Sequence, residues 1–161
     1  METVRRYVLI RLLVGMLVLT AVAAKCEDKD LKKVADGLDD TVAALSAAQK
    51  VVITANTPAT PGGPKLLSDD ATIKIGGALI RVNEAVIKGV EATREIAKLD
   101  EPSRQQIIKI LDPIVKAVGD ILASPDIAGI PNEGTRTGIR IAIEAVRTNL
   151  TAVQTAIALS K

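Results

Sequence analysis

The sequence contains no histidine, tryptophan or phenylalanine, and Tyr7 is its only aromatic residue. Without histidine there can be no Ser-His-Asp arrangement and no histidine general base. A single cysteine and no histidine also exclude the usual zinc sites, which draw most of their ligands from these two residue types. Sugars and nucleobases are usually held by stacking on aromatic side chains, so binding sites of that kind are excluded as well.

The chain of 161 residues also lacks an excess of charge outside its first 24 residues. Lys and Arg total 21 and Asp and Glu total 19, but residues 1–24 contain three Arg and one Glu, which leaves 18 residues of each sign in residues 25–161. A neutral domain has no overall electrostatic attraction to nucleic acid or to an anionic membrane. We therefore expect no nucleic-acid partner.

Residues 1–24 have the pattern of an export signal. Three arginines precede an uninterrupted apolar run of 13 residues, Leu12 to Ala24, after which the sequence becomes polar. A cationic start, a short apolar core and a small-residue exit are typical of a secretory signal peptide. A helix that spans a membrane needs roughly 20 apolar residues, and extending this run to Tyr7 would include the charge of Arg11. The segment therefore predicts export, to a bacterial periplasm or cell envelope.

Small residues at the end of this segment predict where a signal peptidase would cut. Ala21-Val22-Ala23 and Val22-Ala23-Ala24 both fit its preference, so we expect cleavage after Ala23 or Ala24. The alternative is that residues 1–24 stay in place as an uncleaved membrane anchor.

Cys26 follows this segment closely. Its position is similar to that of the acylated cysteine of bacterial lipoproteins, but Lys25 stands where those signals have Gly, Ala or Ser. A single cysteine in an oxidising compartment either stays free or pairs with another chain. Lipidation of Cys26, an intermolecular disulfide and an exposed free thiol are the three alternatives. A catalytic thiolate is not expected, because no histidine is present to activate it.

Residues 25–161 are predicted to form a single all-α domain of four helices. Apolar residues recur with the spacing of helices that bury one face, and the last stretch is the most regular, with Ile139, Ile143, Val146, Leu150, Val153 and Ile157 at alternating spacings of four and three. The helices are expected at 28–56, 68–99, 103–123 and 135–160. Short breaks between them favour an antiparallel up-and-down four-helix bundle, preceded by the N-terminal signal or anchor helix.

Proline and glycine mark the breaks in this pattern. Residues 57–64 contain three prolines and two glycines and cannot continue a helix. Pro113 falls within the third helix, where we expect a kink or a restart. Residues 124–134 are expected to form a loop in which Ile127 and Ile130 pack onto the end of the bundle; the alternative is that they face a partner.

No candidate catalytic, cofactor or metal site emerges from the remaining residues. The acidic pairs Asp39-Asp40 and Asp69-Asp70 lack a calcium-loop pattern and are interpreted as helix caps and solvated faces, as is Asp28 with Asp30. Arg140, Glu144 and Arg147 have the spacing of a charge network within one helix. The segment 134–138, at the start of the last helix, is a weaker candidate for anion binding.

These observations predict an exported, non-enzymatic helical-bundle protein of the cell envelope that needs no cofactor. We expect it to act through helix-mediated association, either with a protein partner or with a second copy of itself. Two alternatives remain open. The bundle could carry an apolar ligand, such as an acyl chain, between its helices, with room opened at Pro113. Alternatively, residues 1–24 remain attached to the membrane and the protein is a periplasmic spacer.

Overall fold

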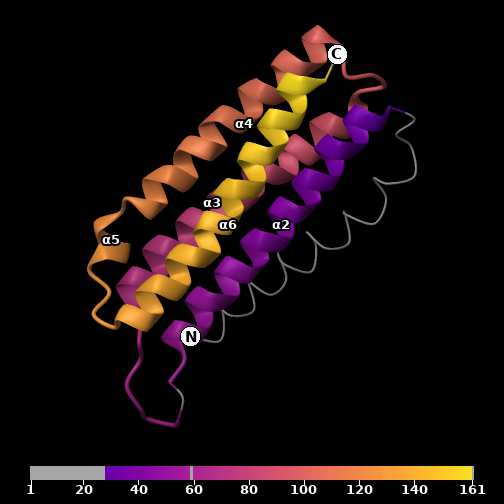
Figure 1. The fold of residues 1–161 in the computed structure, drawn as a ribbon. Helices are drawn as coiled ribbons and strands as arrows, with labels where there is room; N and C mark the ends of the chain where they lie inside the picture. Colours follow the sequence, from indigo (N-terminus) through magenta and orange to yellow (C-terminus); the bar gives the residue numbers. More distant parts are fainter. Residues whose placement is uncertain (1–27, 59, 161) are drawn as a thin grey trace.

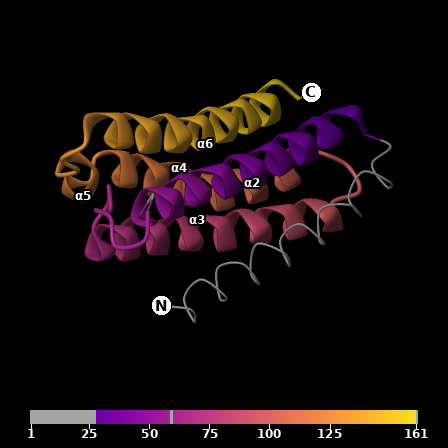
Figure 2. The same cartoon turned by 90° about the horizontal axis from the view of Figure 1, so that it is seen from below.

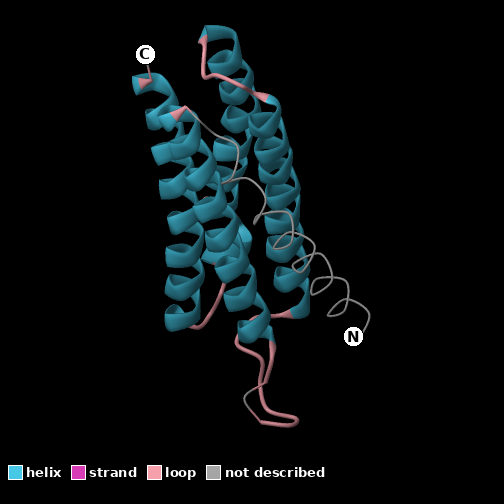
Figure 3. Ribbon diagram, turned by 90° about the vertical axis from the view of Figure 1, so that its right-hand side faces the viewer, coloured by secondary structure: helices cyan, strands magenta, loops and turns pink. Residues whose placement is uncertain are grey.

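The computed structural model describes residues 28–58 and 60–160, which are helical throughout apart from the connecting loops, with no strand among them (Figures 1 and 3). This confirms the all-α class. The described part of the chain contains four long helices and one short helix: α2 (Lys29–Asn56), α3 (Asp69–Glu95), α4 (Glu101–Leu122), α5 (Pro125–Ala128) and α6 (Glu133–Leu159). The signal or anchor segment, its cleavage positions after Ala23 and Ala24, and Cys26 lie outside the described residues.

The four long helices pack side by side as a bundle in which each runs antiparallel to its two neighbours (Figure 2). Helix α2 packs on α3, α3 on α4, and α4 on α6, and α6 closes the ring by packing on α2. Hydrogen bonds between distant residues join α6 to both of its neighbours. Asn149 Nδ2 of α6 donates to the Asp40 carbonyl of α2 at 3.0 Å, and Gln154 Nε2 of α6 donates to Asp112 Oδ1 of α4 at 2.8 Å.

The centre of the bundle is an aliphatic core built from one stripe of each helix. All six residues of the predicted stripe on α6 are buried. Helices α3 and α4 also bury one apolar face each, which includes Ile75 and Val82 of α3 and Ile107 and Ile114 of α4. Helix α2 buries the widest face, because it packs extensively against both α6 and α3. The apolar periodicity therefore identified the core correctly.

Helices α2 and α6 approach each other closely at Gly37. A Cβ atom placed on Gly37 would lie 2.6 Å from Cγ2 of Val153, which is well inside van der Waals contact. Since Val153 is itself buried, its methyl group has little room to move. Glycine at position 37 is what allows the two helices to pack at this distance.

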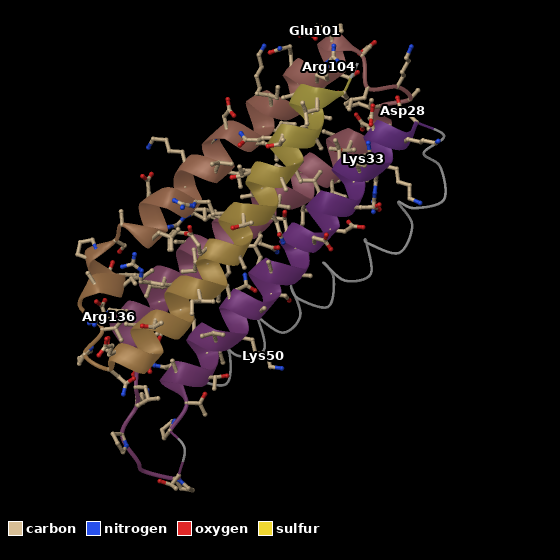
Figure 4. The ribbon with its side chains drawn as sticks, viewed as in Figure 1. Asp28, Lys33, Lys50, Glu101, Arg104 and Arg136 are labelled. Carbon is tan, nitrogen blue, oxygen red and sulfur yellow. The ribbon has the colours of Figure 1, made fainter. Side chains whose placement is uncertain are left out.

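Polar groups connect the helix ends. Asp28 caps α2 by accepting from the amides of Asp30 (2.9 Å) and Leu31 (3.3 Å), and it also accepts from the amide of Leu99 (3.2 Å) just before α4. These bonds, led by the one from Leu99, lower the pKa of Asp28. Arg104 of α4 donates to the carbonyl of Ser160 at the end of α6. Asp28 and Arg104 therefore lie at the same end of the bundle (Figure 4).

Three features differ in detail from the predicted segments. Helix α3 ends at Glu95 rather than at 99, because the residues after it turn back so that Leu99 reaches Asp28. Helix α4 continues through Pro113 without a restart. Pro113 has no amide hydrogen to donate to the carbonyl of Lys109, one turn earlier in the helix. Both residues are exposed, so water can donate to that carbonyl instead.

The third difference is that the predicted loop 124–134 contains the one-turn helix α5. Ser124 caps it, with Oγ accepting from the amide of Asp126 at 3.1 Å. Ile127 and Ile130 are both buried against the bundle. The expected packing of these two side chains is confirmed, although the segment is more regular than a loop.

Candidate functional site

A groove of about 820 Å³ lies between α3 and α4 and extends to α5. Buried core side chains, Ile75 and Val82 of α3 and Ile114 and Ile121 of α4, form its floor. Its walls are apolar too, and Ile73, at one end, is 69% exposed. The exposed apolar surface of the groove is therefore that of Ile73 and Pro113, together with the half-buried Ala78, Ala85 and Ala117.

Small residues produce this groove. Ala78 and Ala85 of α3 face Pro113 and Ala117 of α4 across it, and none of these side chains is long enough to fill the space between the helices. The contrast with the α2–α6 contact, where Gly37 permits close packing, shows that the bundle is tight on one side and open on the other. Pro113 is among the residues that line the groove.

Charged side chains of both signs border the groove. Lys74 and Arg81 come from α3, and Asp120 and Asp126 come from α4 and α5. Lys74 Nζ lies 3.4 Å from Asp126 Oδ1 and 2.8 Å from Asp70 Oδ2, which raises the pKa of the lysine. The border can therefore complement a partner that also carries both signs.

A second hollow, of about 520 Å³, lies on another flank of the bundle, where α6 passes Leu122 of α4. Arg136, Arg140 and Arg147 line it together with Glu144. Arg147 pairs with Glu144, as the charge-network interpretation expected. The weaker anion-binding candidate predicted from the sequence was segment 134–138; in the structure the cationic surface extends further along α6, to Arg140 and Arg147.

The acidic pair Asp69-Asp70 has the environment of surface residues at a helix start. Asp69 and Asp70 are exposed in the first turn of α3, where Ser68 is the N-cap. Hydrogen bonds from Lys65 and Asn56 lower the pKa of Asp69. Among the residues from 28 to 160 that the structure describes, no three His, Cys, Asp or Glu side chains are grouped to hold a metal ion.

Asp39 differs from the other acids. Its Oδ1 atom is buried and has no hydrogen-bond partner among the described residues. Burial, followed by the negative charge of Asp36, raises its pKa; Asp40 adds to this shift and Arg94 opposes it. The sequence offered no signal for this environment, because Asp39 stands in an ordinary acidic pair.

Comparisons of the chain with protein-family models, with curated proteins and with solved structures found no match. Within the described helices, none is long and apolar enough to cross a membrane.

Proposed function

We propose that the chain is an exported, non-enzymatic helical-bundle protein of the cell envelope that acts by helix-mediated association, and that the α3–α4 groove receives a second copy of the same chain. The observation that carries the proposal is the aliphatic groove, in which Ile73 and Pro113 are exposed above a buried floor. Contiguous exposed apolar surface on a folded domain is typical of an interaction site. With no aromatic residue beyond Tyr7, aliphatic helix-on-helix packing is the contact available to this protein.

Charge complementarity favours a second copy as the occupant. Since α3 and α4 are antiparallel, with Gly89 beside Ile110 and Lys74 beside Asp126, Arg81 and Asp120 lie at about the same level along the groove. A two-fold axis along the groove places α3 of one copy over α4 of the other. Arg81 then faces Asp120 of the second copy, and the same pair forms again on the other side of the axis.

Light scattering coupled to size-exclusion chromatography tests this association over a range of protein concentrations. We expect a monomer–dimer equilibrium that Ile73→Ser shifts toward monomer by at least tenfold in dissociation constant. Leu159→Ser is the matched control, because Leu159 is 74% exposed and lies outside the groove. A protein that stays monomeric at its highest soluble concentration contradicts the proposal.

A charge-reversal pair makes the test specific for the two-fold arrangement. Arg81→Glu alone should weaken the dimer, because the new carboxylate of one copy then faces the carboxylate of Asp120 in the other. Asp120→Arg in the same chain should restore it, because the pair is then reversed rather than lost. Failure of the double variant to recover the dimer would rule out this arrangement.

A second candidate function is favoured by the position of Pro113 in the groove. The volume of about 820 Å³ falls within the roughly 300–1,000 Å³ of small-molecule sites, which are mostly apolar with a few polar groups. The floor and the polar border of the groove meet this description for an acyl chain with a polar head. In this alternative the protein carries an apolar ligand rather than a second copy.

Native mass spectrometry of gently purified protein distinguishes the two functions, because a carrier retains a ligand mass and a dimer does not require one. Ala85→Phe should fill the groove and remove a bound ligand, whereas Ala152→Phe, at an exposed position of α6, should not. Absence of any ligand mass from the unmodified protein counts against the carrier.

The attachment of the protein is tested separately. Retention of residues 1–24 would make it a membrane-anchored periplasmic spacer, and acylation or disulfide pairing of Cys26 would attach it in other ways. Intact-mass measurement of the exported protein distinguishes cleavage after Ala23 or Ala24, acylation of Cys26 and retention of the full chain, since each gives a different mass.

A further inference from the structure

The arginine-lined hollow between α4 and α6 concentrates positive charge on one helix face. Arg136, Arg140 and Arg147 are separated by four and seven residues, which places them on the same side of α6. Glu144 is the only acid among the described residues that line the hollow, so its four charged side chains carry a net charge of +2. This excess is local, because residues 25–161 are neutral as a whole.

The surroundings do not compensate these charges. Arg136 donates to a neutral acceptor, the carbonyl of Ile130, at 3.2 Å. Arg147 shares Glu144, and Arg140 has no ion pair among the residues the structure describes. Arg136 also stands in the first turns of α6, which begins at Glu133, where the helix dipole disfavours a cation and favours an anion. Figure 4 shows Arg136 at this end of the bundle, near α5.

The same hollow has room and apolar contacts. Its volume is about 520 Å³, Leu122 of α4 lines it, and Ile141, also lining it, is 66% exposed. Thr137 adds a hydroxyl donor to the three guanidinium groups.

We infer that this hollow binds a phosphate group. Guanidinium groups donate paired hydrogen bonds to phosphate oxygens, which makes arginine well suited to phosphate recognition. A bound phosphate would give Arg140 and Arg136 the acidic partner that neither has among the described residues. The phosphate belongs either to a phospholipid headgroup, whose acyl part would contact Ile141 and Leu122, or to a soluble phosphate ester. This site is separate from the α3–α4 groove and does not depend on the function proposed for it.

Nuclear magnetic resonance of the arginine Nε–Hε groups tests the site in the full-length protein. Titration with inorganic phosphate, against chloride at equal ionic strength, should shift the signals of Arg136, Arg140 and Arg147 saturably. Arg140→Gln should weaken the phosphate affinity by at least tenfold. Lys50→Gln is the control of equal charge change, because Lys50 is exposed on α2, away from the hollow (Figure 4).

Vesicles identify the source of the phosphate. Flotation with phosphatidylglycerol vesicles, compared with phosphatidylcholine vesicles, is measured for the unmodified chain and for both variants, in which residues 1–24 are identical. If Arg140→Gln reduces flotation with phosphatidylglycerol vesicles, the phosphate belongs to a lipid headgroup. If inorganic phosphate binds saturably and Arg140→Gln leaves flotation unchanged, the ligand is a soluble phosphate ester. If Arg140→Gln and Lys50→Gln behave alike in both assays, the charge acts nonspecifically and the inference is wrong.

Discussion

Replacing Gly37 by alanine separates helix propensity from packing at the α2–α6 contact. Within a helix, alanine is favoured over glycine by about 1 kcal/mol. At position 37, however, the new Cβ atom would lie 2.6 Å from Cγ2 of Val153. The side chain of Val153 is β-branched, buried and restricted in rotation, so α2 and α6 must shift. Overpacking of this kind costs about 2 kcal/mol, and Gly37→Ala should therefore lower the free energy of unfolding by about 1 kcal/mol.

Gly76 provides the matched comparison. It also lies inside a helix, α3, but a Cβ atom at this position would meet nothing within 4 Å. Gly76→Ala should therefore keep the propensity gain and raise the free energy of unfolding by about 1 kcal/mol. The two substitutions are chemically identical, and the structure predicts opposite signs for them.

Urea denaturation followed by circular dichroism measures both effects without an aromatic reporter. A further variant tests the cause: in a Val153→Ala background the overlap is removed, so Gly37→Ala should become stabilising by about 1 kcal/mol. If Gly37→Ala stabilises the unmodified protein as much as Gly76→Ala does, the close approach of α2 and α6 is not a constraint and this reasoning is refuted.

Three other predictions can be checked by the same denaturation assay. Asp28→Ala should lower the free energy of unfolding by about 1 kcal/mol at pH 7. The folded-state pKa of Asp28 lies below its ordinary value of 3.8. This loss of stability should therefore vanish as the pH falls from 3.8 through the lowered pKa. Asp39→Asn should stabilise the protein by about 1 kcal/mol at pH 7; because the folded-state pKa of Asp39 is raised, the gain should shrink as acid neutralises the carboxylate of the unmodified protein. Ile143→Ala should cost about 3 kcal/mol because Ile143 is buried, whereas a similar loss from Ile141→Ala would mean that the burial pattern of α6 is wrong.

The sequence predicted the helices and the core well because both depend on local periodicity. The stripe from Ile139 to Ile157 is buried as a unit, and the helix starts lie within about two residues of their predicted positions, as the usual uncertainty of helix ends allows. The end of α3 was predicted less well. It depends on the bond between Leu99 and Asp28, two residues far apart in the chain, and no local pattern encodes such a contact.

The two hollows could not be predicted from the sequence in the same way. Ala78 and Ala85 are ordinary helix residues, and the space beside them becomes a groove only where Pro113 and Ala117 pass opposite. The arginines of α6 have the spacing of a surface charge network. Their grouping around a hollow depends on how little α4 fills the space beside them, which is a property of helix packing rather than of either helix alone.

The α2–α6 contact has a consequence for how the protein is made. The helix that leaves the ribosome first among the described residues forms its most extensive packing with the one that leaves last. While the chain is being synthesised, α2 and α3 can pair, but the aliphatic face of α2 has no permanent cover until α6 has emerged. A domain of this connectivity therefore cannot complete its core until α6 has been synthesised.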